Sequence, residues 1–169
     1  MDFDVAFKWL YDSALAMTIR ENELLFPWIE SLHVLSITLV VGSIAIVDLR
    51  LLGLASLDRA VTRVTRDVLP CTWIAFAFAA LTGAALFTSN AVNYAHNFYF
   101  QGKILLLALA GLNMLAFHLA IGKQIANWEA LAIPPFRAKI VAAASLILWV
   151  IIIGFGRWIG FTIQPTLTG

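Results

Sequence analysis

Charged residues are scarce in this sequence. Only 12% of its 169 residues are Asp, Glu, Lys or Arg, whereas an ordinary soluble domain has about 25%. The formal net charge is +1, and no basic face stands out beyond the segments next to a membrane, which excludes a nucleic-acid partner. Apolar residues make up 62% of the chain, in long unbroken runs. This composition predicts an all-α integral membrane protein, since the runs lack the alternation of barrel strands.

Cysteine is nearly absent as well. Cys71 is the only one, so the chain can form no intrachain disulfide and has no CxxC or CxxCH motif for zinc or covalently attached haem. Any haem would therefore be bound non-covalently. The first residues, MDFDVAFKWLYDS, also lack the basic segment and apolar core of a cleaved secretory signal. No internal repeat is evident, and we expect residues 1–169 to form a single transmembrane domain.

Four apolar runs predict four membrane spans, at about 27–50, 69–89, 103–122 and 138–161. Residues 3–20 and 54–68 carry apolar side chains at helical spacing and predict two helices that lie in the membrane surface. The polar and aromatic stretch 90–102 is typical of an interfacial connection. The expected fold is a four-helix bundle with an N-terminal and a cytoplasmic amphipathic surface helix.

Basic residues predict the orientation of these spans. The side that holds the connections after the first and third spans has seven, and the other side has four. The seven are Arg50, Arg59, Arg63, Arg66, Lys123, Arg137 and Lys139, and the four are Lys8, Arg20, Lys103 and Arg157. By the positive-inside rule the seven are cytoplasmic. We therefore expect a multi-pass protein of the bacterial inner membrane, with both termini in the periplasm.

Four ionisable residues share the outer level of the predicted bundle. Glu30 and His33 begin the first span, Lys103 begins the third, and Arg157 ends the fourth. Ionisable groups at membrane depth are costly and mark functional interiors. His33 could ligate haem iron, with Lys103 and Arg157 near the propionates and Glu30 beside His33 on the same helix face. Alternatively, Glu30 pairs with Lys103 or Arg157, and His33 only forms a hydrogen bond between helices.

His118 lies at a different level. His33 is about 9 Å below the start of its span and His118 about 22 Å below the start of the third, so in straight, level helices they cannot share one iron. Helix offset, tilt or pairing across a dimer would bring them together. Otherwise His33 could pair with His96, if that connection folds inward. His118 would then be a second site or a hydrogen-bonded core histidine.

Three further polar residues are expected to be structural. Arg50, at the end of the first span, is predicted to extend to the lipid headgroups. Asp48 points in another direction and could accept a hydrogen bond from a neighbouring helix end. Asn113, in the middle of the third span, is predicted to form a hydrogen bond with another helix.

The segments WIESLHVLSITLVVGSIAIVDLRLLG and FQGKILLLALAGLNMLAFH resemble an uncharacterised family of small four-helix bacterial membrane proteins. The likeness covers most of the chain, from the first surface helix through the third span. More distantly, a four-helix membrane bundle with histidines in its first and third spans is similar to copper-resistance D and HemJ-like proteins and to b-type cytochromes. That resemblance implies haem b and electron transfer, with His33 and His118 as the metal ligands. The chain has too few histidines for two complete bis-histidine sites.

The sequence therefore predicts a membrane-embedded haem b protein that relays electrons to or from quinone or a larger respiratory complex. A homo-oligomer, or membership of a larger membrane complex, is expected. The alternative is a non-catalytic membrane subunit or assembly partner without a cofactor, in which the buried polar residues only fix helix packing. Transport of a metal or small solute is a third hypothesis, although four spans leave little room for a pore in one protomer.

Overall fold

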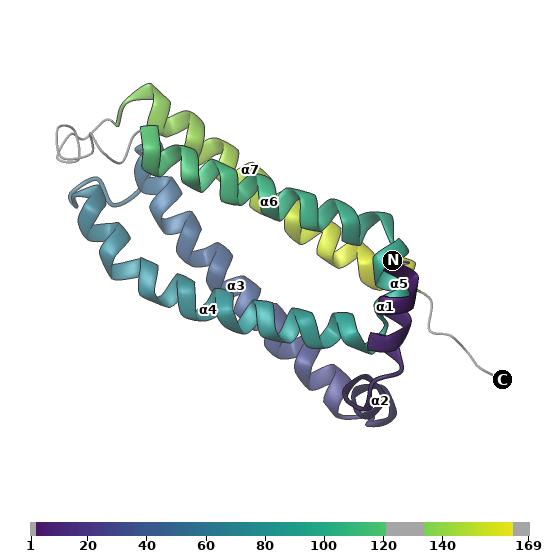
Figure 1. Cartoon of the computed structure of the whole chain (residues 1–169). Helices are drawn as coiled ribbons and strands as arrows, with labels where there is room; N and C mark the ends of the chain where they lie inside the picture. The colour runs from purple at the N-terminus through teal and green to yellow at the C-terminus, as the bar shows by residue number, and fades with distance from the viewer. Residues whose placement is uncertain (1–2, 121–133, 164–169) are drawn as a thin grey trace.

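The computed structural model describes residues 3–120 and 134–163, and every regular element in these ranges is an α-helix (Figure 1). There are seven: α1 (Phe3–Tyr11), α2 (Ala14–Glu21), α3 (Leu25–Leu52), α4 (Val61–Ser89), α5 (Ala91–His96), α6 (Phe98–Ala120) and α7 (Phe136–Thr162). Four of them, α3, α4, α6 and α7, are long and apolar enough to cross a membrane. Each is longer than the roughly 20 residues that a span requires. Lys123 of the predicted cytoplasmic side and the last two residues of the predicted third span lie outside the described residues.

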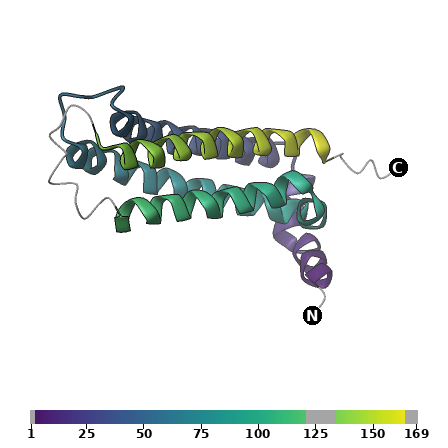
Figure 2. The same ribbon diagram turned by 90° about the horizontal axis from the view of Figure 1, so that it is seen from above.

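The four long helices run side by side as two hairpins, α3 with α4 and α6 with α7 (Figures 1 and 2). Packing between α3 and α7 joins the hairpins, whereas α4 and α6 form no extended contact within the described residues. The bundle is therefore open on one side, which we call the α4–α6 side. Helices α1 and α2 project sideways at one end, where α1 packs against α5 and α2 against α3 and α4 (Figure 2). We call this the α5 end, and the opposite end, with the connection from Gly53 to Ala60, the Arg50 end.

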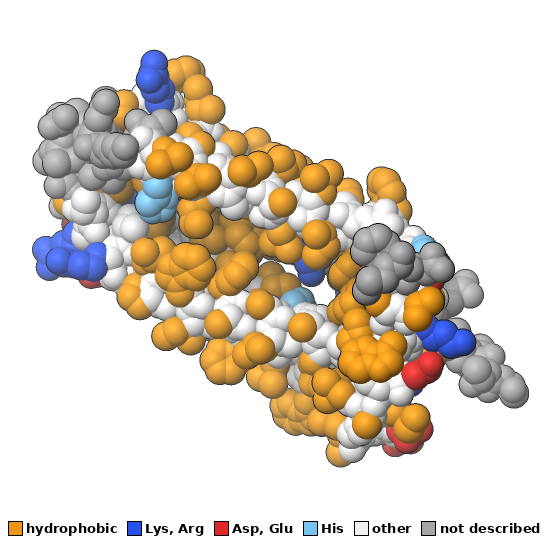
Figure 3. Space-filling view, viewed as in Figure 1, with side chains coloured by type: hydrophobic (Ala, Val, Ile, Leu, Met, Phe, Trp, Pro, Cys, Tyr) orange, Lys and Arg blue, Asp and Glu red, His pale blue; other side chains and the backbone are white. Residues whose placement is uncertain are grey.

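Large apolar side chains cover the outside of the long helices (Figure 3). Leu81, Leu105 and Val150 are 69%, 63% and 68% exposed. In water such a surface would be a large unfavourable apolar patch, whereas a bilayer solvates it. The buried core is correspondingly small, and its main cluster lies at the Arg50 end around Leu51 and Val61. The folded chain thus has the surface of a multi-pass membrane protein.

Local hydrogen bonds fix both ends of α3. Asn22 Oδ1 accepts from the backbone N–H groups of Leu24 and Leu25, so the helix begins before Pro27. Pro27 falls in the first turn, where a missing N–H leaves no bond unmade. The helix ends at Gly53, whose φ of 77° is left-handed, and Leu54 N–H returns to the Leu49 carbonyl. This arrangement is a Schellman motif, and only glycine adopts its turn residue at no steric cost.

The predicted surface helix at 54–68 is wrong. Leu54 to Ala60 form a connection, and residues from Val61 onward are the first turns of α4, with Pro70 inside that helix. Val61 and Val64 are 0% and 5% exposed. Val61 packs with Leu51 and residues of α7 in the core cluster. Burial of these valines in the bundle outweighs the one backbone bond that Pro70 removes.

Two other boundaries differ from the expectation. The single surface helix at 3–20 is two helices, because Ser13 caps α2 by accepting from the Ala16 N–H. The stretch 90–102 is not a loop but α5 followed by the start of α6. Asn97 separates them, and its Oδ1 accepts from the N–H groups of Tyr99 and Phe100. Both breaks come from side-chain capping, which hydrophobic periodicity does not register.

Polar contacts connect the long helices. The predicted link from Asn113 is confirmed: its Nδ2 donates to the Val141 carbonyl of α7 at 3.0 Å. Asp48 accepts from Ser145 of α7. Arg50 does not extend to the headgroups, because it is only 1% exposed and its Nε donates to the Arg59 carbonyl at 2.8 Å. The guanidinium thereby holds the connection from Gly53 to Ala60 against the end of α3.

Candidate functional site

His33 lies in the third turn of α3, faces α4 and forms a hydrogen bond with it. Its Nδ1 lies 3.0 Å from Thr82 Oγ1, and the Thr82 hydroxyl donates to the Phe78 carbonyl at 2.6 Å. Because the hydroxyl hydrogen is used in that bond, the Thr82 oxygen accepts from His33 Nδ1–H. The backbone of Ala79 is also within hydrogen-bonding range of the ring. This arrangement leaves Nε2 as the nitrogen with the free lone pair.

Gly83 gives the imidazole its room. A Cβ at Gly83 would lie 2.9 Å from His33 Cε1 and 3.4 Å from Nδ1. Such distances are shorter than van der Waals contact, so only glycine lets the ring lie this close to α4. The His33 ring therefore lies against Gly83 and the backbone of Ala79 on α4.

A Gly83→Ala substitution is expected to displace the His33 ring and break its bond to Thr82. The new methyl group would require the ring to shift by several tenths of an ångström. Histidine side-chain nitrogen NMR on selectively labelled protein should report a change in the His33 tautomer or hydrogen bond. Gly42→Ala on α3 is the matched control, since a Cβ there would meet nothing within 4 Å. An unchanged His33 signal in the Gly83→Ala chain would contradict the assigned geometry.

Lys103 reaches the same place from α6. Its side chain lies over Gly156 of α7, where a Cβ would be 3.5 Å from Nζ. The ammonium is half-buried, acts electrostatically on His33, and forms no hydrogen bond or ion pair with any residue that the structure describes. Figure 3 shows a basic and a histidine side chain together in the hollow of the α4–α6 side. A cation at membrane depth without an anionic neighbour is costly, so an anionic ligand group would be stabilised here.

Glu30 acts on Tyr94 and forms no ion pair with Lys103 or Arg157 among the described residues. Tyr94 lies on the short helix α5, beyond the long helices, and is half-buried. Burial raises the pKa of the Tyr94 phenol above its ordinary value, and the negative charge of Glu30 raises this pKa further. The phenol therefore remains a neutral hydrogen-bond donor.

Titration of Tyr94 should show this shift. Between the pKa of an unfolded tyrosine, about 10, and the higher folded value, only the unfolded chain loses the proton, so stability should fall as the pH rises above about 10. We expect Glu30→Gln to move the Tyr94 pKa back towards 10. Ultraviolet difference titration of each chain against its Tyr94→Phe counterpart isolates this phenol from Tyr11 and Tyr99. The same titration curve with and without Glu30 would contradict the electrostatic contact.

The remaining predicted residues lie elsewhere. His96 Nε2 is 3.0 Å from the Asp4 carboxylate, and both side chains are exposed. Arg157 is exposed and lies over the Phe161 ring, with Cζ 4.8 Å from its centroid. His118 is exposed near the Arg50 end, and its Nδ1 contacts the Met114 carbonyl at 2.9 Å.

These positions separate the histidines. Fifteen residues of α6 separate Lys103 from His118, which is about 22 Å along the helix. Since Lys103 lies at His33, the two intramembrane histidines are too far apart to share one iron within this chain. No group of three or more His, Cys, Asp or Glu that could hold a metal ion occurs among the described residues.

Comparison with known proteins identifies the family. The model of the Family of unknown function (DUF6644) matches residues 6–162. The chain belongs to the DUF6644 family. No curated protein and no solved structure matches it significantly, so nothing there supports the wider likeness to copper-resistance D or HemJ-like proteins. The matched range of this DUF6644 chain includes His33, Thr82 and Lys103.

Sequence reasoning missed three members of the DUF6644 site: Thr82, Gly83 and Gly156. The position of Gly83 opposite His33 depends on the register of α3 against α4. Thr82 and Gly156 carry no signal of their own, because threonine and glycine are frequent in apolar helices. His33 meets Thr82 and Gly83, and Lys103 meets Gly156. The members of each pair are distant in the chain, and a single sequence does not show which distant residues are in contact.

Proposed function

We propose that this chain is a membrane-embedded haem b protein in which His33 is the axial ligand. The observation that carries the proposal is the orientation of the imidazole, whose Nδ1–H is directed at Thr82 on α4, so that the lone pair of the neutral ring lies on Nε2. Histidines that bind metals commonly donate their other N–H to an oxygen, which fixes the tautomer and the ring. The hydrogen bond from His33 Nδ1–H to Thr82 fixes the ring in this way.

Lys103 and the α4–α6 side supply two further requirements. Haem has carboxylates on a flat apolar ring, and Lys103 is a half-buried cation beside His33 without an anionic neighbour among the described residues. Because α4 and α6 form no extended contact away from their Phe87–Phe100 ring stack, a flat amphiphilic molecule could enter between them from the bilayer. Lys103 would pair with a propionate, and His33 would hold the iron.

The chain offers one imidazole at this level. The sequence has three histidines. His96 is the last residue of α5 and contacts Asp4, and His118 lies in the last turn of α6 and contacts the Met114 carbonyl. If His33 alone held the haem iron, the reduced protein should bind carbon monoxide. Bound haem would supply one-electron chemistry, and the protein would relay electrons to or from quinone or a larger respiratory complex.

Absorption spectra of the full chain test this proposal. The protein is purified in mild detergent after expression with ample haem supply, and spectra are recorded oxidised, reduced with dithionite, and reduced under carbon monoxide. We expect a b-type spectrum that His33→Ala abolishes and that Lys103→Met weakens more than Lys103→Arg. His96→Ala and His118→Ala are the matched controls and should keep the wild-type spectrum.

A colourless, monodisperse protein from haem-supplied cells would overturn the haem proposal. So would a spectrum that His33→Ala leaves unchanged. Either result would favour the alternative of a non-catalytic subunit or assembly partner, and proteins that co-purify with the tagged chain would then identify the complex.

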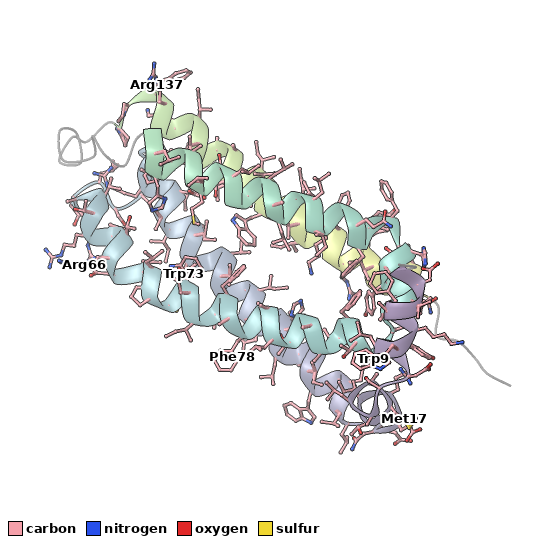
Figure 4. The ribbon with its side chains drawn as sticks, viewed as in Figure 1. Trp9, Met17, Arg66, Trp73, Phe78 and Arg137 are labelled. Carbon is pink, nitrogen blue, oxygen red and sulfur yellow. The ribbon has the colours of Figure 1, made fainter. Side chains whose placement is uncertain are left out.

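We also propose a location in the bacterial inner membrane with both termini in the periplasm. In support, exposed basic residues gather at the Arg50 end: Arg59, Arg63, Arg66 and Arg137, two of which are labelled in Figure 4. The α5 end, where Figure 4 labels Trp9 and Met17, has fewer. Reporter fusions after residue 169 and within the connection from Gly53 to Ala60 test the orientation. A cytoplasmic C-terminus would reverse it.

A further inference from the structure

A pocket of about 390 Å³ lies at the α5 end, lined by residues of α1, α4, α5 and α6. Figure 1 shows these helices coming together at that end. The lining residues of the pocket are Phe7, Phe87, Ala95, Phe100, Gln101 and Ile104. The volume falls in the range of about 300–1,000 Å³ that is usual for small-molecule sites, and the pocket is wide open at the molecular surface. All the lining side chains except Gln101 are apolar, and none is charged, so the pocket suits a neutral ligand.

Flat aromatic rings form one wall of this pocket. Phe87 of α4 and Phe100 of α6 are stacked, with ring centroids 5.2 Å apart and an interplanar angle of 17°. Phe7 of α1 meets Phe87 edge-on at 6.0 Å, and Tyr94 packs against Phe100 at 5.7 Å from outside the lining. Four elements therefore hold the rings in place, and the wall is preorganised for another flat ring.

Gln101 is the one polar side chain of the lining. Its Nε2 donates to the Ala95 carbonyl at 2.8 Å, which fixes the side-chain amide at the pocket. One N–H of that amide remains for a ligand. An acyl chain has no use for a hydrogen-bond donor, whereas a ring carbonyl accepts from one.

The pocket lies next to the His33 site. Phe87 is one helical turn after Gly83, whose Cα faces the His33 ring, and Ile104 directly follows Lys103. Beyond the Phe87–Phe100 stack, α4 and α6 form no extended contact within the described residues, so an apolar tail could pass from the pocket into the bilayer between them. A ligand here would be close enough to the His33 site to exchange electrons with it.

We propose that this pocket binds the ring of a membrane-soluble quinone, with its tail leaving between α4 and α6. Quinones are flat, uncharged and carry ring carbonyls, which match the aromatic wall, the absence of charge in the lining and the Gln101 amide. The quinone would be the electron partner of the proposed haem site, so its role as a redox partner rests on the proposed function. Quinone binding itself does not require haem.

Photolabelling of the full chain in phosphatidylcholine nanodiscs tests the proposal. The probe is a short-tailed azidoquinone, with excess decylubiquinone as competitor and mass spectrometry to map the labelled peptides. We expect competable labelling on α4 and α6 near Phe87 and Phe100. Ala95→Phe, which fills the pocket, should reduce it at least tenfold, and Gln101→Leu should reduce it severalfold. Leu105→Phe is the matched control, because it adds a ring on α6 at a residue that is 63% exposed and does not line the pocket.

Labelling that decylubiquinone does not compete, or that both Ala95→Phe and Gln101→Leu retain, would overturn the quinone site and indicate that lipid alone fills the pocket. If Ala95→Phe does not fold, Gln101→Leu still decides, because unchanged labelling in that chain overturns the proposal. His33→Ala separates the two proposals. Its labelling should persist after its haem spectrum is lost, so a colourless protein with competable labelling would remove the haem site and leave the quinone site standing.

Discussion

The Gly102→Ala substitution is expected to destabilise the α6–α7 hairpin by about 1–3 kcal/mol, the usual cost of overpacking a tight contact. A Cβ at Gly102 would overlap Phe155 Cε1 and lie 2.9 Å from Cδ1. Phe155 cannot simply move aside, because its ring also packs edge-on against Tyr99 at 5.5 Å and lies 6.4 Å from Phe98. The strain would have to separate α6 from α7.

Gly111→Ala is the matched control for this substitution. It lies on the same helix, and a Cβ there would meet nothing within 4 Å. Relief of the glycine backbone entropy should make Gly111→Ala neutral or stabilising by up to about 1 kcal/mol. Equilibrium unfolding in mixed micelles of increasing SDS content measures both free energies of unfolding. Equal effects of the two substitutions would contradict the close approach of α6 and α7 at Gly102.

The Arg50→Ala substitution should reduce the free energy of unfolding by about 3 kcal/mol or more. Arg50 is 1% exposed, and its Nε bond to the Arg59 carbonyl fixes the connection between α3 and α4. A hydrogen bond from a charged group contributes about 1.5–3 kcal/mol, and removal of a large buried side chain adds the cost of a cavity. Arg50→Lys should lose the fork-shaped donor but retain part of the packing, so it should lie in between.

Arg59→Ala distinguishes a backbone contact from a charge effect. The Arg59 side chain is exposed. Arg50 donates to the backbone carbonyl of Arg59, which the Arg59→Ala substitution keeps. The free energy of unfolding of Arg59→Ala should therefore stay within about 0.5 kcal/mol of wild type. The same micelle titration measures all three chains. A large loss in Arg59→Ala, or none in Arg50→Ala, would contradict the structural role assigned to Arg50.

The long helices and one contact between them were predictable from the sequence. The runs around His33, Asn113 and Ile152 are too long and too apolar for anything but candidate spans. Asn113 had to find a partner, since an unsatisfied amide in an apolar medium is costly, and the Val141 carbonyl supplies it. Predictions of this kind succeed because they depend on one segment and its solvent.

Element ends and side-chain directions were less predictable. Val61 and Val64 read as the apolar face of a surface helix, because lipid and a helix core attract the same residues. Arg50 was expected at the headgroups and instead points inward. Long helices that are apolar on all sides do not specify in their own sequence which side faces protein and which faces lipid.

For the candidate site, the sequence pointed to the residues but not to the arrangement. Six side chains were predicted to bind a cofactor, and the fold brings His33 and Lys103 together while it places His96, His118 and Arg157 in separate contacts. Glu30 is directed to Tyr94. The position of a residue along its span indicates its depth in the bundle. It does not indicate the direction in which the side chain projects from the helix axis.

By itself, therefore, the sequence determined that this chain forms long apolar helices, because the length and composition of each run decide that its backbone hydrogen bonds must be satisfied within the helix. The tertiary structure alone decided that Gly83 admits the His33 ring, that Lys103 lies over Gly156, and that the α4–α6 side is open. Those features depend on the rotation and register of helices against one another. Steric fit between distant segments sets both, and steric fit exists only once the helices are packed.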